Sequence, residues 1–76
     1  GGKMYFSERL KYLRKLHMIP QKNLAEYLGI SVSAYQYYEA GKNEPSIERL
    51  IMLADLFGVS LDYLVGRTEN PLMNSE

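Results

Sequence analysis

The chain has 76 residues, the size of one small domain. Such a domain buries only about 60% of the surface that its unfolded chain exposes, so it has no room for a deep catalytic cleft. Cysteine is absent, which excludes disulfide bonds and thiolate metal sites and fits a reducing cytoplasm. No apolar run approaches the roughly 20 residues of a membrane span, and the net charge of zero argues against a strongly basic nucleic-acid binder.

The neutral total conceals an uneven distribution of charge. Residues 1–43 contain seven basic and three acidic residues, a net charge of +4, whereas residues 44–76 contain two basic and six acidic residues, a net charge of −4. A polarised chain of this kind is compatible with a basic surface for an anionic partner and with ordinary solvated helix faces. Charge alone leaves both interpretations open.

Apolar periodicity predicts a first helix over residues 7–17. Ser7 is expected to cap it. Its apolar stripe is expected to consist of Phe6, Leu10, Leu13 and Leu16.

The segment QKNLAEYLG, residues 21–29, continues the apolar pattern as a second helix that its final glycine ends. Only Gly29 and Ile30 separate it from a third helix, which Ser31 is expected to cap. A connection this short forces the two helices to cross steeply, with Ala25 at their close approach. The pattern is typical of a helix-turn-helix.

The third helix, SVSAYQYYEA, is rich in tyrosine and is expected to end at Gly41. Tyr35 and Tyr38 share a face at i and i+3 and are expected to pack in the core, each hydroxyl reaching a polar edge. The outward patch is expected to consist of Val32, Ser33, Gln36 and Tyr37.

The outward patch of the third helix offers the groups that read base edges in a DNA major groove. Gln36 is suited to a bidentate pair with adenine, Ser33 to a base or phosphate, and Val32 to a thymine methyl group. The alternative is an ordinary solvated helix face.

Capping residues and breakers divide the rest of the chain. Pro45 disfavours helix at the residue before it, and Ser46 is expected to cap a fourth helix, IERLIMLADLF, that closes at Gly58. Ser60 is expected to cap a short fifth helix, LDYLV, that stops at Gly66. One apolar face of the fourth helix is expected to consist of Ile47, Leu50, Ile51, Ala54 and Phe57.

Most of these helices are too short to be stable alone, so they can bury a common core only as a compact globule. The sequence therefore predicts an all-α fold of five helices that contains a helix-turn-helix. The domain is expected over residues 4–66. Residues 1–3 are typical of a cloning remnant, and residues 67–76 lack periodicity and are expected to form a C-terminal tail or linker.

Four features occur in one order along residues 9–66. They are Arg14, "Q..LA..LGIS" over residues 21–31, "YE.GK..PS" over residues 38–46 and "L..LAD.FGVS.D.L" over residues 50–64. Together they resemble the phage-repressor type of helix-turn-helix, the Xre and Cro-like family. The resemblance implies a five-helix, sequence-specific DNA-binding transcriptional regulator, of the repressor type, whose third helix reads the major groove.

The resemblance also implies roles for individual residues. Gln21 matches a glutamine that opens the second helix and touches the DNA backbone, and Arg14 and Glu39 match an ion pair that bridges the first and third helices. The residues expected to contact DNA are Gln21, Ser31, Val32, Ser33, Gln36, Tyr37, Lys42 and Asn43.

The sequence departs from the family pattern in three ways. Pro20 stands where the family usually has Ser or Thr, so the second helix should lack a side-chain cap. Met18 replaces a usual glycine, which predicts a less tight exit from the first helix. The outward patch has no Arg or Lys, so binding should depend more on thymine methyl groups and DNA shape than on guanine.

A second interpretation is a helix-turn-helix used as a protein-interaction module, like an antirepressor or antitoxin, because tyrosine is favoured at protein interfaces. An enzyme is not expected. His17 is the only histidine, and no metal motif, phosphate loop or carboxylate pair is present. No cofactor and no metal are expected.

Double-stranded DNA is the expected partner, and no membrane partner or small-molecule ligand is evident. The protein is expected to bind DNA as a homodimer through its C-terminal helix. Its expected location is the cytoplasm, on prokaryotic or phage DNA. The residues expected at the dimer contact are Leu61, Tyr63, Leu64 and Val65.

Overall fold

The computed structural model describes residues 5–72, which contain five α-helices and no strand. The all-α fold predicted from the sequence is confirmed. The expected cloning remnant at residues 1–3 and the end of the expected tail at residues 73–76 lie outside the described residues. The helices are α1 (Phe6–Leu16), α2 (Gln21–Leu28), α3 (Val32–Glu39), α4 (Ile47–Phe57) and α5 (Leu61–Leu64).

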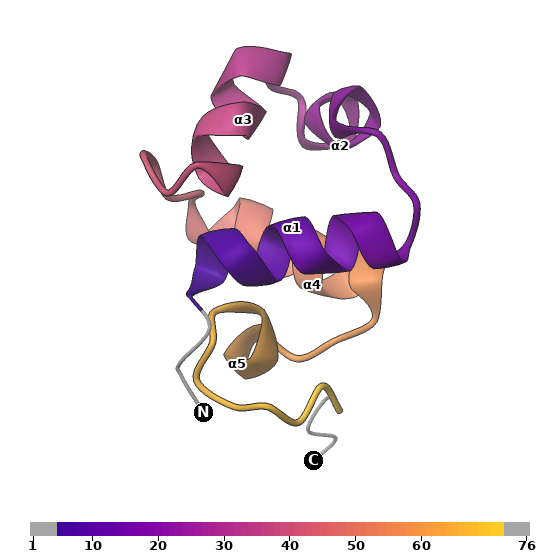
Figure 1. Cartoon of the computed structure of the whole chain (residues 1–76), viewed down its shortest axis with the longest axis vertical. Coiled ribbons are helices and arrows are strands. Elements are labelled where there is room, and N and C mark those ends of the chain that lie inside the picture. Colours follow the sequence, from indigo (N-terminus) through magenta and orange to yellow (C-terminus); the bar gives the residue numbers. More distant parts are fainter. Residues whose placement is uncertain (1–4, 73–76) are drawn as a thin grey trace.

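The five helices form three tiers (Figure 1). α2 and α3 cross steeply at one end of the molecule, α1 and α4 lie at the same level in the middle with the core between them, and α5 closes the other end. One apolar core joins the tiers, so α3 is supported by the whole domain although it has only eight residues. The core consists of Leu10, Leu13, Leu24, Ala25, Leu28, Tyr35, Tyr38, Leu53, Ala54, Phe57, Val59 and Leu64.

Local signals set most helix ends. Three of the four predicted serine caps are confirmed, because the side-chain oxygens of Ser31, Ser46 and Ser60 accept hydrogen bonds from the N–H groups three residues on, at 3.1, 3.3 and 3.0 Å. Gly29 and Gly58 are left-handed, with φ of 72° and 68°, and follow α2 and α4 as predicted.

The start of α1 differs from the prediction. Tyr5, not Ser7, is the N-cap residue, and the Glu8 carboxylate accepts a hydrogen bond from the Tyr5 N–H at 3.2 Å. Leu16, expected on the apolar stripe, is 61% exposed. Each step of three residues falls about 60° short of a full turn, so after Leu13 the stripe has rotated away from the core.

The buried face of α4 is also rotated relative to the prediction. Ile47 and Ile51 are 70% and 43% exposed, whereas Leu53, which was not assigned to the core, is completely buried. The face that packs inward is centred on Leu50, Leu53 and Phe57. Periodicity identified the helix, but its exact rotation depends on which side α1 and α2 cover.

Residues 67–72, which fall in the predicted tail, contact the helices. Arg9 of α1 is 1% exposed, with its Cζ atom 3.8 Å from the centre of the Tyr63 ring. Its guanidinium also lies 2.8 Å from the Glu69 carboxylate. In addition, the Ser60 N–H donates to the Pro71 carbonyl at 3.1 Å. These contacts hold the segment against the tier that α5 forms.

The exit from α1 is tight, so the expectation based on Met18 was wrong. Met18 adopts a left-handed backbone with φ of 58°. Its N–H donates to the Lys15 carbonyl at 3.0 Å, and the Ile19 N–H donates to the Arg14 carbonyl at 3.1 Å. This is the Schellman arrangement that glycine usually makes.

We expect Met18→Gly to stabilise the fold by about 0.5 to 1 kcal/mol, because glycine adopts the left-handed backbone without strain. The Met18 side chain is 88% exposed, so its removal forfeits little buried area. The measurement is urea unfolding of the two proteins. Met18→Ala removes the same thioether but keeps the strain, so equal stabilisation by alanine would contradict the explanation.

Candidate nucleic-acid interface

At the start of α2, beside α3, the N–H groups of Gln21 and Lys22 have no intrahelical acceptor. Pro20 is the N-cap residue and makes no side-chain cap, as expected from the sequence. Its carbonyl accepts from the N–H groups of Asn23 and Leu24, at 3.0 and 3.3 Å. The helix dipole adds partial positive charge at this end, next to the half-buried Gln21 and the exposed Lys22. An anionic group such as a phosphate fits this environment.

The rotation of α3 is fixed by its two buried tyrosines. Tyr35 and Tyr38 are 0% and 6% exposed, as predicted, and their rings meet edge to face with centres 6.3 Å apart. The opposite face of the helix is therefore held toward solvent. It presents the exposed residues Val32, Ser33, Gln36 and Tyr37.

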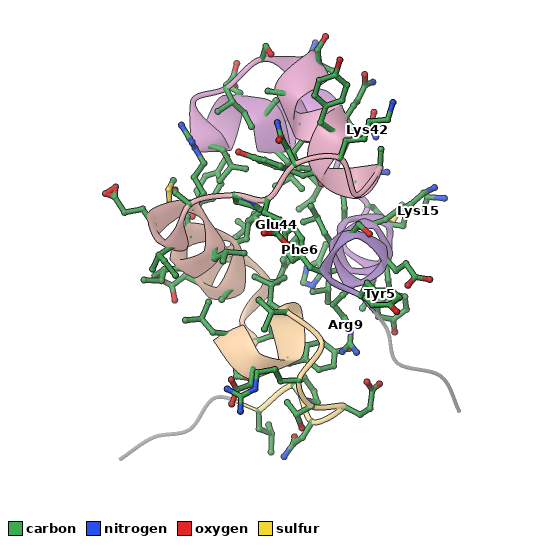
Figure 2. All side chains as sticks on the ribbon, turned by 90° about the vertical axis from the view of Figure 1, so that its left-hand side faces the viewer. Tyr5, Phe6, Arg9, Lys15, Lys42 and Glu44 are labelled. Carbon is green, nitrogen blue, oxygen red and sulfur yellow. The ribbon has the colours of Figure 1, made fainter. Side chains whose placement is uncertain are left out.

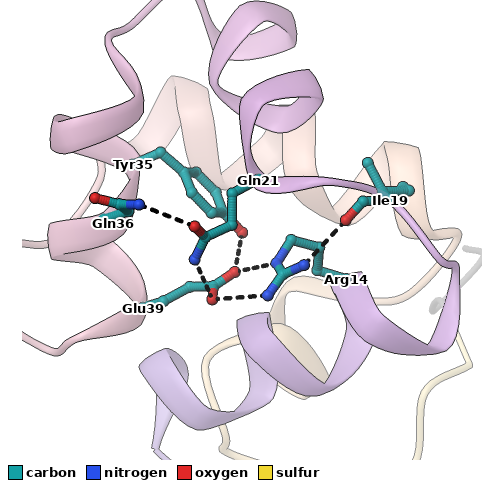
Figure 3. Close-up of polar contacts among 6 residues, drawn as sticks. All are labelled: Arg14, Ile19, Gln21, Tyr35, Gln36 and Glu39. Atoms are coloured by element: carbon teal, nitrogen blue, oxygen red, sulfur yellow. Dashed lines mark hydrogen bonds and ion pairs between the residues drawn. The ribbon is translucent and has the colours of Figure 1, made fainter.

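An ion pair ties α3 to α1, at the positions that the resemblance implied. The Arg14 Nε lies 2.5 Å from one oxygen of Glu39, and the Arg14 Nη2 lies 3.2 Å from the other, so the contact is bidentate (Figure 3). The side chains are 13% and 5% exposed. Arg14 also donates to the Ile19 carbonyl at 3.1 Å, which secures the turn after α1.

Two further donors complete the surroundings of Glu39. The Tyr35 hydroxyl donates to it at 2.5 Å, and the Gln21 Nε2 donates at 3.1 Å (Figure 3). Neither contact was predicted. The i, i+4 spacing of Tyr35 and Glu39 on one helix is a signal for the first, whereas nothing local in the sequence indicates the second.

The contacts change the acidity of the groups involved. Burial raises the pKa of Glu39, but hydrogen bonds from Arg14, Tyr35 and Gln21 outweigh it and leave that pKa below its ordinary value. Burial, followed by the hydrogen bond to Glu39, raises the pKa of the Tyr35 hydroxyl. Glu39 is therefore ionised at neutral pH, and Tyr35 remains a donor to it.

The hydrogen-bonded chain continues to the surface of α3. The Gln36 Nε2 donates to the Gln21 Oε1 at 3.0 Å (Figure 3). The structure thus joins two residues predicted to contact DNA, one from the start of α2 and one from the outer face of α3. Ser31, also in that predicted set, is exposed and serves as the N-cap of α3.

The loop after α3 supplies the remaining predicted contacts. Lys42 and Asn43 are exposed, and their N–H groups both donate to the Tyr37 carbonyl, at 2.9 and 3.4 Å. The Lys42 Nζ lies 5.7 Å from the centre of the Tyr37 ring, within range of a cation–π contact. In Figure 2 Lys42 and Lys15 project on the same side of the molecule.

The positive charge of residues 1–43 is only partly available to a ligand. Arg9 and Arg14 point inward and are ion-paired with Glu69 and Glu39. The exposed basic residues of this half, within the described range, are Lys11, Lys15, Lys22 and Lys42.

No helix within residues 5–72 is long and apolar enough to cross a membrane. The same residues contain no group of three or more His, Cys, Asp or Glu side chains arranged to hold a metal ion.

Two steeply crossing helices joined by the three residues 29–31, the second with an exposed polar face, define a helix-turn-helix protein. Residues 10–64 match the family described as helix-turn-helix. The chain therefore belongs to the helix-turn-helix family.

Individual relatives agree with this assignment. The uncharacterised HTH-type transcriptional regulator YobD of Bacillus subtilis (strain 168) is 42% identical over 66 residues, which are 87% of this chain and 59% of YobD. A transcriptional regulator from Listeria innocua has a TM-score of 0.80 and 38% identity, over 86% of this chain and 61% of that one. The P22 c2 repressor, solved in complex with a synthetic operator, has a TM-score of 0.74 and 32% identity, over 82% of this chain and 94% of that one. The chain thus spans about three fifths of YobD.

We expect Glu39→Gln to destabilise the fold by about 3 kcal/mol at pH 7, because it leaves the Arg14 charge without a partner. The lowered pKa of Glu39 means that the contribution of its charge is complete above the ordinary value of 4.5 and is lost as pH falls through the lower, folded-state pKa. The difference from wild type should therefore shrink in acid. Urea unfolding at several pH values measures it.

Asp62→Asn is the matched control, because Asp62 and Arg67 form a surface pair at 3.5 Å with side chains 50% and 75% exposed. Its effect should stay within about 0.5 kcal/mol. A Glu39→Gln protein as stable as the control variant would show that the Glu39 pair is only a surface contact.

Proposed function

We propose that the chain is a sequence-specific DNA-binding transcriptional regulator, of the repressor type, that places α3 in the major groove. The observation that carries the proposal is the outward face of α3, which is exposed, uncharged and held in one rotation by Glu39 and the buried tyrosines. The structural similarity to the P22 c2 repressor, solved in complex with a synthetic operator, supports it. Such a regulator is not an enzyme, and it acts in the cytoplasm, where its DNA lies.

Different parts of this surface suit different kinds of contact to DNA. The start of α2 with the exposed Lys22, and the loop with Lys42 and Asn43, suit contacts to phosphates, which fix the register of the protein on the duplex. Gln36, Val32 and Ser33 suit contacts to base edges and thymine methyl groups. Because the reading face has no charge, sequence preference has to come from hydrogen bonds and apolar contacts.

We expect selection from random DNA to yield one enriched sequence motif. Affinity for that motif should fall about tenfold or more as salt rises from about 50 to about 200 mM, because each phosphate contact releases counterions. A helix-turn-helix that instead grips a partner protein through its tyrosines would select no motif, and its partner contact would depend little on salt. Either of those results would favour the protein-interaction module.

Two neighbouring tyrosines should separate binding from stability. Tyr38→Ala should destabilise the fold by about 3 to 5 kcal/mol, because it removes a buried aromatic ring. Tyr37→Ala should change stability by less than about 0.5 kcal/mol, because Tyr37 is 49% exposed, yet weaken binding to the selected motif. Thermal melting and DNA titration of both variants test this. Unfolding by Tyr37→Ala would contradict the assigned orientation of α3.

We also propose that two copies bind DNA together through the C-terminal end. One recognition helix reads only a few base pairs, and two copies related by a two-fold axis reach half-sites roughly 34 Å apart. The predicted contact needs revision, since Leu64 is completely buried and Tyr63 and Val65 are half-buried. Leu61, 41% exposed, remains available.

Leu61→Glu should abolish cooperative binding to a duplex with two half-sites, and it should leave affinity for a single half-site within about twofold, because the small interface forms only when DNA aligns the two copies. Leu16→Glu adds the same charge at an exposed leucine of α1 and serves as the control. Titration of both duplexes measures the effect. Equal loss of cooperativity in the two variants would contradict a contact at α5.

A further inference from the structure

The hydrogen-bonded chain from Glu39 to Gln36 has a fixed direction. An ionised carboxylate can only accept hydrogen bonds. Gln21 must therefore turn its Nε2 toward Glu39, at 3.1 Å, which leaves its Oε1 on the opposite side. Gln36 then has to present its Nε2 to that oxygen, at 3.0 Å. Reversing either amide would bring two acceptors or two donors face to face.

We infer that Gln21 is a positioning residue for base recognition, because it fixes the direction of the Gln36 side-chain amide. The inference rests on the proposed function. With one N–H of Gln36 committed to Gln21, the amide edge that remains consists of the Oε1 acceptor and the second N–H donor. This is the complement of the N6 donor and N7 acceptor that adenine presents in the major groove.

We call the hydrogen bond between Gln21 and Gln36 the clamp. Its effect is to preorganise the Gln36 side chain. Gln36 is exposed, so its side chain would otherwise sample several rotamers and both amide directions. Ordering it before DNA arrives removes part of the entropic cost of forming a bidentate contact. The direction is set from the interior of the protein, since Glu39 is itself held by Arg14 and Tyr35.

This role differs from a contact to the DNA backbone, which was the expectation for Gln21. A phosphate contact carries no base information, so its loss weakens binding to every sequence alike. Loss of the clamp, in contrast, should reduce discrimination at the one base pair that Gln36 reads. The two roles therefore predict different patterns across a set of mutated operators.

Gln21 can be changed without removing the support of α2 against α3. The two helices also meet through the buried residues Ala25, Leu28 and Tyr35. Gln21→Met keeps the length and most of the volume of the side chain while removing its amide. Thermal melting of this variant should give a folded protein.

The experiment measures the affinities of wild type, Gln21→Met, Gln36→Met and the double variant for the selected motif and for each single base-pair change. Gln36→Met should lose discrimination at one position by about tenfold. Gln21→Met should lose about threefold or more at the same position, and the double variant no more than Gln36→Met alone. Lys42→Met is the control for uniform weakening. Multiplicative losses, or uniform weakening by Gln21→Met, would overturn the inference.

A measurement without DNA separates this inference from the proposed function. In the nuclear magnetic resonance spectrum of the free protein, Gln21→Met should move the Gln36 side-chain amide signals toward those of an unstructured glutamine. Unchanged Gln36 signals would show that Gln21 does not hold the Gln36 amide, even if the protein binds DNA in the other experiments. If wild type selects no motif, the proposed function and the base-reading role both fail, while this measurement still decides whether the clamp exists.

Discussion

The burial of one carboxylate, that of Glu39, acts together with the buried Tyr35 and Tyr38 to fix how α3 sits on the domain. Taking an ion out of water is costly unless its hydrogen-bonding capacity is met. Here donors from three elements meet it: Arg14 of α1, Gln21 of α2 and Tyr35 of α3 itself. A small rotation of α3 would lose several of these bonds at once. The same requirement that keeps the charge satisfied therefore keeps the outward face of the helix in one position.

This arrangement explains why the residue at position 14 matters chemically and not only electrostatically. Arg14 spans both oxygens of Glu39 and still reaches the Ile19 carbonyl, which needs a planar group with several donors. A lysine carries the same charge but cannot make a bidentate contact. The guanidinium thus connects α1, the turn at Ile19 and the end of α3.

Sequence was informative where structure is local and less so where it depends on the tertiary environment. Ser31, Ser46 and Ser60 cap helices through hydrogen bonds to the residue three positions on, so a serine directly before a helical pattern predicts each cap. The exposure of Ile47 could not be predicted, because it depends on which neighbour covers α4. The ion pair of Arg14 and Glu39 was predicted from the family resemblance alone. The hydrogen bond between Gln21 and Gln36 joins two helices through side-chain amides, and no periodicity in the sequence indicates it.

The basic residues divide into those that hold the domain together and those that are exposed to a ligand. Two arginines of the basic half, Arg9 and Arg14, are used inside the domain, so the exposed positive charge comes from lysines around α1, α2 and the loop after α3. The acidic residues of α4 and α5 remain exposed. A neutral but polarised molecule is oriented by the field of DNA yet gains little general affinity from it. Under the proposed function, discrimination between sequences depends on how well the uncharged face of α3 is ordered before it meets the bases.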